Sequence, residues 1–144
     1  MIKKIFKYGK IINCKRNPLS AIISILQNNL VELSWAHNLN DIFKYFDIYY
    51  KIMDEFKKNF PDSIYEVQLE NFVDEPIIES KKLMKFCDLP WDKSCLQFHK
   101  RKDLISKTTS GIQIRQEIFK YPREKDLPYM EFLKEYKNKY YWFN

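Results

Sequence analysis

The residues best suited to chemistry are Arg16-Asn17-Pro18, followed eight residues after Arg16 by Ser24. A short apolar run, Lys10–Cys14, precedes them and is typical of a strand, whereas Asn17 and Pro18 favour the start of a helix. A guanidinium group forms paired hydrogen bonds with phosphate, and both the N-terminus of a helix and the carboxyl end of a strand attract such ligands. Arg16 and Ser24 are therefore candidate ligands of a phosphate group. Spacing alone favours the simpler alternative, an arginine beside the cap of a surface helix.

A second candidate site is the polar segment Thr108–Arg115, which includes Ser110, Gly111 and Arg115. A hydroxyl-rich turn with one glycine and a nearby arginine could close over a nucleotide. Segments of this composition are also common as solvent-facing loops. Both interpretations stay open for this segment.

The glycine content excludes the common nucleotide-binding loops. The chain has two glycines, Gly9 and Gly111, whereas Rossmann and Walker phosphate loops need several glycines in a short run. Four arginines stand beside 21 lysines, and the formal net charge is +6. A lysine excess of this kind is typical of a solvated surface, although it also suits an acidic partner.

The cysteines, histidines and apolar runs limit the class of protein further. Cys14, Cys87 and Cys95 are odd in number and have apolar neighbours, which predicts buried free thiols in a reducing compartment. His37 and His99 lack ligand-type neighbours at metal spacing, so we expect no metal site. The apolar runs are far shorter than the roughly 20 residues of a membrane span. We therefore expect a cytoplasmic protein without a metal or a membrane anchor.

Strands that alternate with helices predict an α/β layer structure. Apolar residues recur at helical spacing from Pro18 and again along a long helix over 42–60, which Asn38 or Asn40 caps and Pro61 ends. The remaining predicted elements are a second strand at Ile64–Leu69, a helix from Pro76, a turn into a short helix through Cys95 and Phe98, and a last helix from Asp126-Leu127-Pro128.

Several segments of the sequence, taken in order, resemble those of a known family, although no single segment is specific. The segments are Lys10–Leu19 with Ser24, Ala36–Leu39, the strand Ile64–Leu69 with Glu70 and Pro76, Phe86–Asp92, and Thr109–Gln116. This order resembles the bacterial sulfotransferase family from about Phe6 to Gln116. It is most similar to the branch whose catalytic domain follows tetratricopeptide repeats and is related to tyrosylprotein sulfotransferases.

The resemblance implies an α/β fold related to P-loop kinases, here mostly helical with about two parallel strands. It implies 3′-phosphoadenylyl sulfate (PAPS) as the sulfuryl donor, with no metal. In that family, an arginine and a serine spaced like Arg16 and Ser24 hold the 3′-phosphate of the donor. The resemblance also gives Ser110 and Arg115 a role in covering the nucleotide. The acceptor would be a hydroxyl group on a protein tyrosine, a glycan or a small molecule. Its side of the cleft could be lined by Trp35, His37 and the aromatic face around Tyr45 and Tyr49, unless these residues belong to the core.

The resemblance also implies that residues 1–144 form the carboxyl-terminal portion of such a domain. Relatives have a Ser/Thr/Gly loop for the 5′-phosphosulfate and a catalytic base after it, and neither can be assigned here, so no catalytic residue is named. We therefore expect a sulfotransferase-type domain that is inactive alone, and the sequence leaves open whether it is an enzyme. The alternative is a noncatalytic basic module for nucleic acid or an acidic protein, although no nucleic-acid motif favours it.

Overall fold

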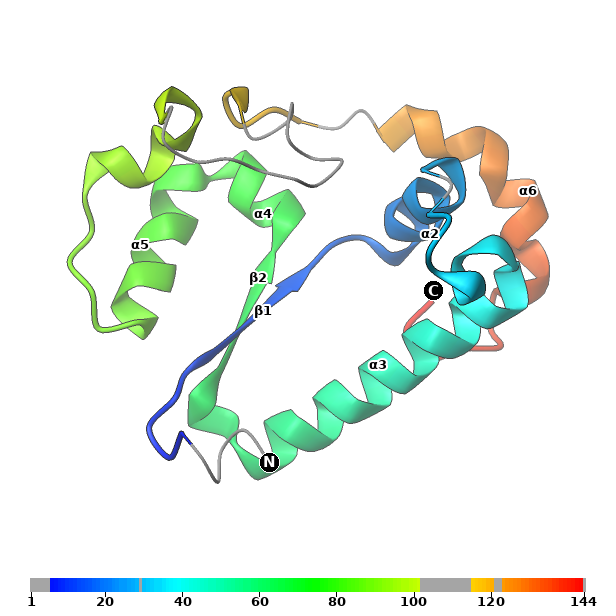
Figure 1. The fold of residues 1–144 in the computed structure, drawn as a ribbon, viewed down its shortest axis with the longest axis horizontal. Coiled ribbons are helices and arrows are strands. Elements are labelled where there is room, and N and C mark those ends of the chain that lie inside the picture. The colour runs from blue at the N-terminus through cyan, green and yellow to red at the C-terminus, as the bar shows by residue number, and fades with distance from the viewer. Residues whose placement is uncertain (1–5, 29, 102–114, 121–122, 144) are drawn as a thin grey trace. The chain divides into compact units, whose positions relative to one another are not determined.

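A computed structural model describes residues 6–28, 30–101, 115–120 and 123–143 (Figure 1). The chain divides into two compact units, each of which is described by itself. The first unit comprises the described parts of residues 1–11, 16–64 and 122–144. The second comprises the described parts of residues 12–15 and 65–121.

Two helices organise the first unit, and an asparagine caps each of them. Helix α2 spans Pro18–Gln27, with Asn17 as its N-cap and proline in its first position. Helix α3 spans Leu39–Asn59 and begins where the Asn38 side chain accepts hydrogen bonds from the backbone N–H groups of Asn40 and Asp41. These caps satisfy donors that the first helical turn leaves unpaired, which confirms both predicted helix starts.

Short helical segments complete the first unit. They are the 3₁₀ helices η1 (Ser34–His37) and η2 (Pro61–Ser63), the 3₁₀ helix η7 (Arg123–Tyr129), helix α6 (Met130–Leu133) and the 3₁₀ helix η8 (Lys134–Tyr136). The last helix is therefore shorter than the sequence predicts. Pro128 lies inside the 3₁₀ segment, where its missing N–H prevents a regular α-helical ladder.

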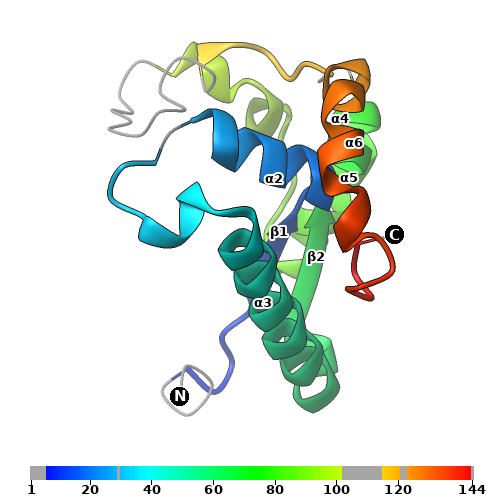
Figure 2. The same cartoon turned by 90° about the vertical axis from the view of Figure 1, so that its right-hand side faces the viewer.

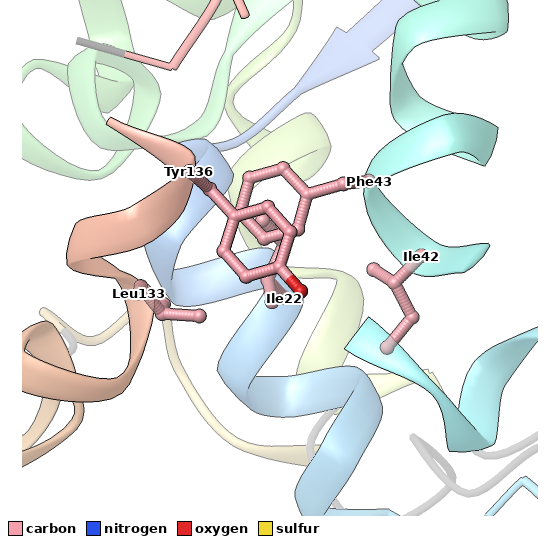
Figure 3. Packing of buried hydrophobic residues seen from close by; sticks show 5 residues of the cluster. All are labelled: Ile22, Ile42, Phe43, Leu133 and Tyr136. Carbon is pink, nitrogen blue, oxygen red and sulfur yellow. The ribbon is translucent and has the colours of Figure 1, made fainter. Parts of the chain in front are cut away.

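The core of the first unit lies where α2, α3 and the C-terminal segment meet. Its buried side chains are Ile22, Ile42, Phe43, Leu133 and Tyr136 (Figure 3). The rings of Phe43 and Tyr136 stack with their centroids 4.0 Å apart and an interplanar angle of 9°. Burial raises the pKa of the Tyr136 hydroxyl above its usual value of 10.0. The C-terminal residues thus belong to the core of this unit.

The second unit includes most of a two-stranded parallel sheet (Figure 2). Strand β1 spans Ile11–Lys15 and β2 spans Ile64–Gln68, so the described residues confirm the predicted mostly helical α/β class. In β1 the buried residue is the polar Asn13, whose amide donates to Oε1 of Glu66 over 3.1 Å. Lys15 also pairs with Glu66, with Nζ and Oε1 3.6 Å apart. The polar contacts of Glu66 thus join the two strands.

Helices α4 (Leu69–Asp74) and α5 (Pro76–Phe86) follow β2, and two 3₁₀ helices, η3 (Lys93–Leu96) and η4 (Phe98–Lys100), come next. Helix α5 ends in a left-handed turn, because Asp88 has a φ of 57°. The backbone N–H groups of Asp88 and Leu89 bond back to the carbonyls of Lys85 and Met84. This pattern is the Schellman C-cap, which usually places glycine where Asp88 stands.

The prediction of buried thiols is wrong in part. All three cysteines are free, but Cys14 and Cys95 are exposed and Cys87 is half-buried. Cys14 follows the buried Asn13 in β1, and successive side chains of a strand point to opposite faces. An apolar neighbourhood in the sequence therefore did not place this thiol in the core.

Candidate functional site

Arg16 lies immediately before the cap of α2 and is half-buried. Asn17 Oδ1 accepts a hydrogen bond from the backbone N–H of Ser20 over 3.3 Å, and Pro18 has no N–H to offer. The cap thus uses part of the donor capacity that the sequence predicted for an anion at this helix end. A phosphate here would depend chiefly on the guanidinium group, with the helix dipole adding a smaller attraction.

Ser24 lies two turns into α2 and is also half-buried. Its hydroxyl oxygen accepts a hydrogen bond from Nδ2 of Asn28 over 3.2 Å, and the same amide donates to the Ser24 carbonyl over 2.7 Å. A hydroxyl that accepts through a lone pair still has its proton to donate. The Ser24 side chain therefore keeps a donor that suits a phosphate oxygen.

The structure brings two of the four predicted ligands into one compact unit. Arg16 and Ser24 both belong to the first unit and flank the first two turns of α2. Arg115 belongs to the second unit, where it is exposed and donates through Nη1 to the carbonyl of Arg101. Ser110 lies outside the described residues.

Ser20, which lies between the two predicted ligands in the sequence, belongs to a buried pair that the sequence did not predict. The Ser20 hydroxyl donates to Oδ2 of Asp126, and these residues are 6% and 3% exposed. Ser20 is one helical turn before Ser24, so spacing places both serines on one face of α2. The acidic partner is 106 residues away in the sequence, and no local pattern identifies it.

The aromatic residues considered for an acceptor include one close stack. Trp35, half-buried, lies over the exposed ring of Tyr45, with centroids 4.0 Å apart and an interplanar angle of 2°. Both residues belong to the first unit, and η1 contacts α3. The stack offers a flat, partly exposed aromatic surface at the start of α3.

Three carboxylates of the second unit contact polar side chains of the same unit. Glu70 Oε2 accepts from Gln68 Nε2 over 2.5 Å, and Asp74 pairs with Lys120 over 2.5 Å. Glu117 Oε1 lies 3.5 Å from Nε2 of His99, whose Nδ1 is buried without a partner in the described part of the chain. None of these contacts selects a catalytic base.

Within the described residues, no group of three or more histidine, cysteine or acidic side chains is arranged to hold a metal ion. No helix among them combines the length and the apolar character that a membrane crossing requires.

Comparison with known proteins shows the family of this chain. The sulfotransferase family matches residues 1–93, which include both strands and the α2 site. An uncharacterized protein of Aquifex aeolicus (strain VF5) is 32% identical over 144 aligned positions, covering 92% of this chain. The chain spans only 18% of the length of that relative. Because the family match extends over more than half of its residues, the chain belongs to the sulfotransferase family.

Proposed function

We propose that this domain binds the 3′-phosphate side of PAPS for transfer of the sulfuryl group to an acceptor hydroxyl. The observation that carries the proposal is the position of Arg16 and Ser24 in one compact unit, at either end of the first two turns of α2. The donor, when bound, supplies the activated sulfuryl group. The residues of this chain bind and orient its 3′-phosphate.

The chemistry of the two side chains fits a phosphate. Arg16 supplies a charged fork that can bond two phosphate oxygens, and Ser24 supplies a neutral hydroxyl donor. Hydrogen bonds to a charged group contribute about 1.5–3 kcal/mol each. Two or three of them are sufficient to distinguish a nucleotide with a 3′-phosphate from one without it.

We further propose that Ser110 and Arg115 help to cover the nucleotide. Arg115 uses Nη1 in its bond to the Arg101 carbonyl, and a guanidinium group has five N–H donors in all. This part of the proposal draws on the family resemblance and on the exposed position of Arg115.

The acceptor in this proposal is a hydroxyl group of a protein tyrosine, a glycan or a small molecule. The Trp35–Tyr45 stack supports an acceptor with a flat ring, because exposed aromatic faces pack well against such groups. No contact among the described residues specifically favours the alternative of a nucleic-acid module, so it is not proposed.

The sequence has no Ser/Thr/Gly loop that can be assigned to the 5′-phosphosulfate, and among the described residues the geometry selects no carboxylate as a base. We therefore propose that residues 1–144 act as the carboxyl-terminal, 3′-phosphate-binding portion of the domain. Tested alone, the chain should show no transfer of sulfate from PAPS. Donor-dependent sulfation of any acceptor by the purified chain would overturn this part of the proposal.

A thermal-shift experiment tests the binding proposal. Adenosine 3′,5′-bisphosphate should raise the melting temperature of the chain, because a ligand that binds only the folded state stabilises it. Arg16→Ala should abolish that rise, whereas Arg101→Ala removes an equal charge from the second unit and should leave the rise intact. An equal response of the Arg16→Ala variant would remove Arg16 from the site.

A further inference from the structure

Two polar groups of Ser20 form hydrogen bonds with other residues. Its backbone N–H donates to Oδ1 of Asn17, and its hydroxyl donates to Oδ2 of Asp126. Asn17 directly follows Arg16 in the chain and forms the cap of α2. Ser20 thus connects the cap beside Arg16 to a carboxylate that comes from η7.

The Ser20–Asp126 contact is buried, and a second contact accompanies it. Because Ser20 and Asp126 are 6% and 3% exposed, loss of Asp126 would remove the buried acceptor of the Ser20 hydroxyl. Further along α2, Gln27 Nε2 donates to the hydroxyl of Tyr129 over 3.0 Å at an exposed position. Segment η7 therefore contacts α2 near both ends of the helix.

These contacts lie along the helix face that carries the candidate ligand. Ser20, Ser24 and Gln27 are spaced by four and three residues, which places them on one face of α2. Two of the three bond to η7, and the third is Ser24. The buried contact is the one closer to Arg16.

We propose that Asp126 is a positioning residue for the 3′-phosphate site, an inference that rests on the proposed function. Its carboxylate holds the hydroxyl of Ser20, and Ser20 holds the Asn17 cap through its backbone. The first turn of α2 is thereby kept in the orientation in which Arg16 and Ser24 can contact one phosphate. Asp126 acts through Ser20 and does not itself contact the nucleotide.

Binding of adenosine 3′,5′-bisphosphate to substituted chains tests this inference. Asp126→Ala and Ser20→Ala should each weaken binding by about tenfold at temperatures well below their melting points. Asp126→Asn keeps an oxygen that accepts from Ser20, so it should retain most of the affinity. If Asp126→Ala does not fold, the smaller change Ser20→Ala provides the same test.

A matched control separates positioning from a general loss of stability. Ser80 is also a buried serine, 3% exposed, and its hydroxyl accepts from Nε1 of Trp91 over 2.8 Å in the second unit. Ser80→Ala should lower the melting temperature without weakening nucleotide binding. Equal losses of affinity in Ser80→Ala and Ser20→Ala would overturn the positioning role.

Nuclear magnetic resonance provides a second readout that a purely structural role would not change. The chain has four arginines, so the side-chain Nε–Hε signal of Arg16 can be assigned with the Arg16→Ala variant. Asp126→Ala should shift or broaden this signal in the absence of ligand. If the wild-type chain fails to bind the nucleotide, the proposed function falls together with this inference. If it binds through Arg16 and Asp126→Ala changes neither affinity nor signal, only the inference falls.

Discussion

The hydroxyl of Tyr141 donates a hydrogen bond to Oδ2 of Asp54 over 2.5 Å, and 87 residues separate the two in the sequence. Two more hydrogen bonds join the described part of the C-terminal segment to α3. The hydroxyl of Tyr136 donates to Asn40 over 2.9 Å, and the indole of Trp142 donates to Asp47 over 3.3 Å. The three acceptors recur every seven residues and therefore lie along one face of α3. The C-terminal segment thus packs along that face.

This relationship predicts how Tyr141 titrates. The hydrogen bond to Asp54 is the main cause that raises the pKa of Tyr141 from 10.0 to about 12. Because the folded pKa is the higher one, the stabilising contribution is complete below pH 10 and is lost as the pH rises through about 12. Ultraviolet absorbance should show a tyrosine component that ionises through about pH 12, and Tyr141→Phe should remove that component.

The control for this titration is Asp54→Asn, which keeps an acceptor and removes the charge. In that variant the late ionisation should move back toward the ordinary tyrosine value. A component that still ionises through about pH 12, unchanged in both variants, would show that the Asp54 contact is not its cause.

A second prediction concerns Phe43, the centre of the aromatic cluster. Phe43 is 0% exposed and its ring contacts those of Tyr136, Tyr140, Trp142 and Phe143. Phe43→Ala should lower the free energy of unfolding by about 3–5 kcal/mol, because it removes buried apolar area and leaves a cavity. Urea denaturation measures the loss.

Phe132 is the matched control for that substitution, because it is 71% exposed. Phe132→Ala should change the free energy of unfolding by no more than about 0.5 kcal/mol. Similar losses in the two variants would contradict a core centred on Phe43.

A third prediction concerns the end of α5. Asp88 stands at the position of the C-cap that requires a left-handed conformation, with φ of 57°. Asp88→Gly should raise the free energy of unfolding by up to about 1 kcal/mol, because glycine adopts this conformation without steric cost. Asp88→Val should lower it, since a β-branched residue disfavours positive φ. Thermal melts that rank Val above Gly would refute the assignment of this turn.

Local signals predicted the parts of the structure that local contacts determine. Asn17-Pro18 predicted the start of α2, Asn38 or Asn40 the start of α3, and the alternating pattern at Ile64–Leu69 the second strand, and all three predictions are confirmed. The short helix α4 after β2 was missed, because Leu69–Asp74 follows the strand without a capping side chain.

The contacts that complete the first unit could not be predicted from local patterns. Asp126 lies 106 residues from Ser20, and Trp142 lies 95 residues from Asp47. No helical or strand period links residues this far apart. For the same reason, the sequence made Arg16 and Ser24 candidate ligands but did not indicate the buried carboxylate of Asp126, which bonds to Ser20 on α2.

The central claim, that Arg16 binds the 3′-phosphate, is tested most directly by a thermodynamic cycle of binding measurements. The cycle removes the 3′-phosphate of the ligand, the Arg16 side chain, or both. The chain and its Arg16→Ala variant are titrated with adenosine 3′,5′-bisphosphate and with adenosine 5′-phosphate, which lacks the 3′-phosphate. If Arg16 binds that phosphate, the wild-type chain should prefer the bisphosphate by roughly tenfold or more, and the variant should lose this preference. A variant that keeps the full preference would contradict the account.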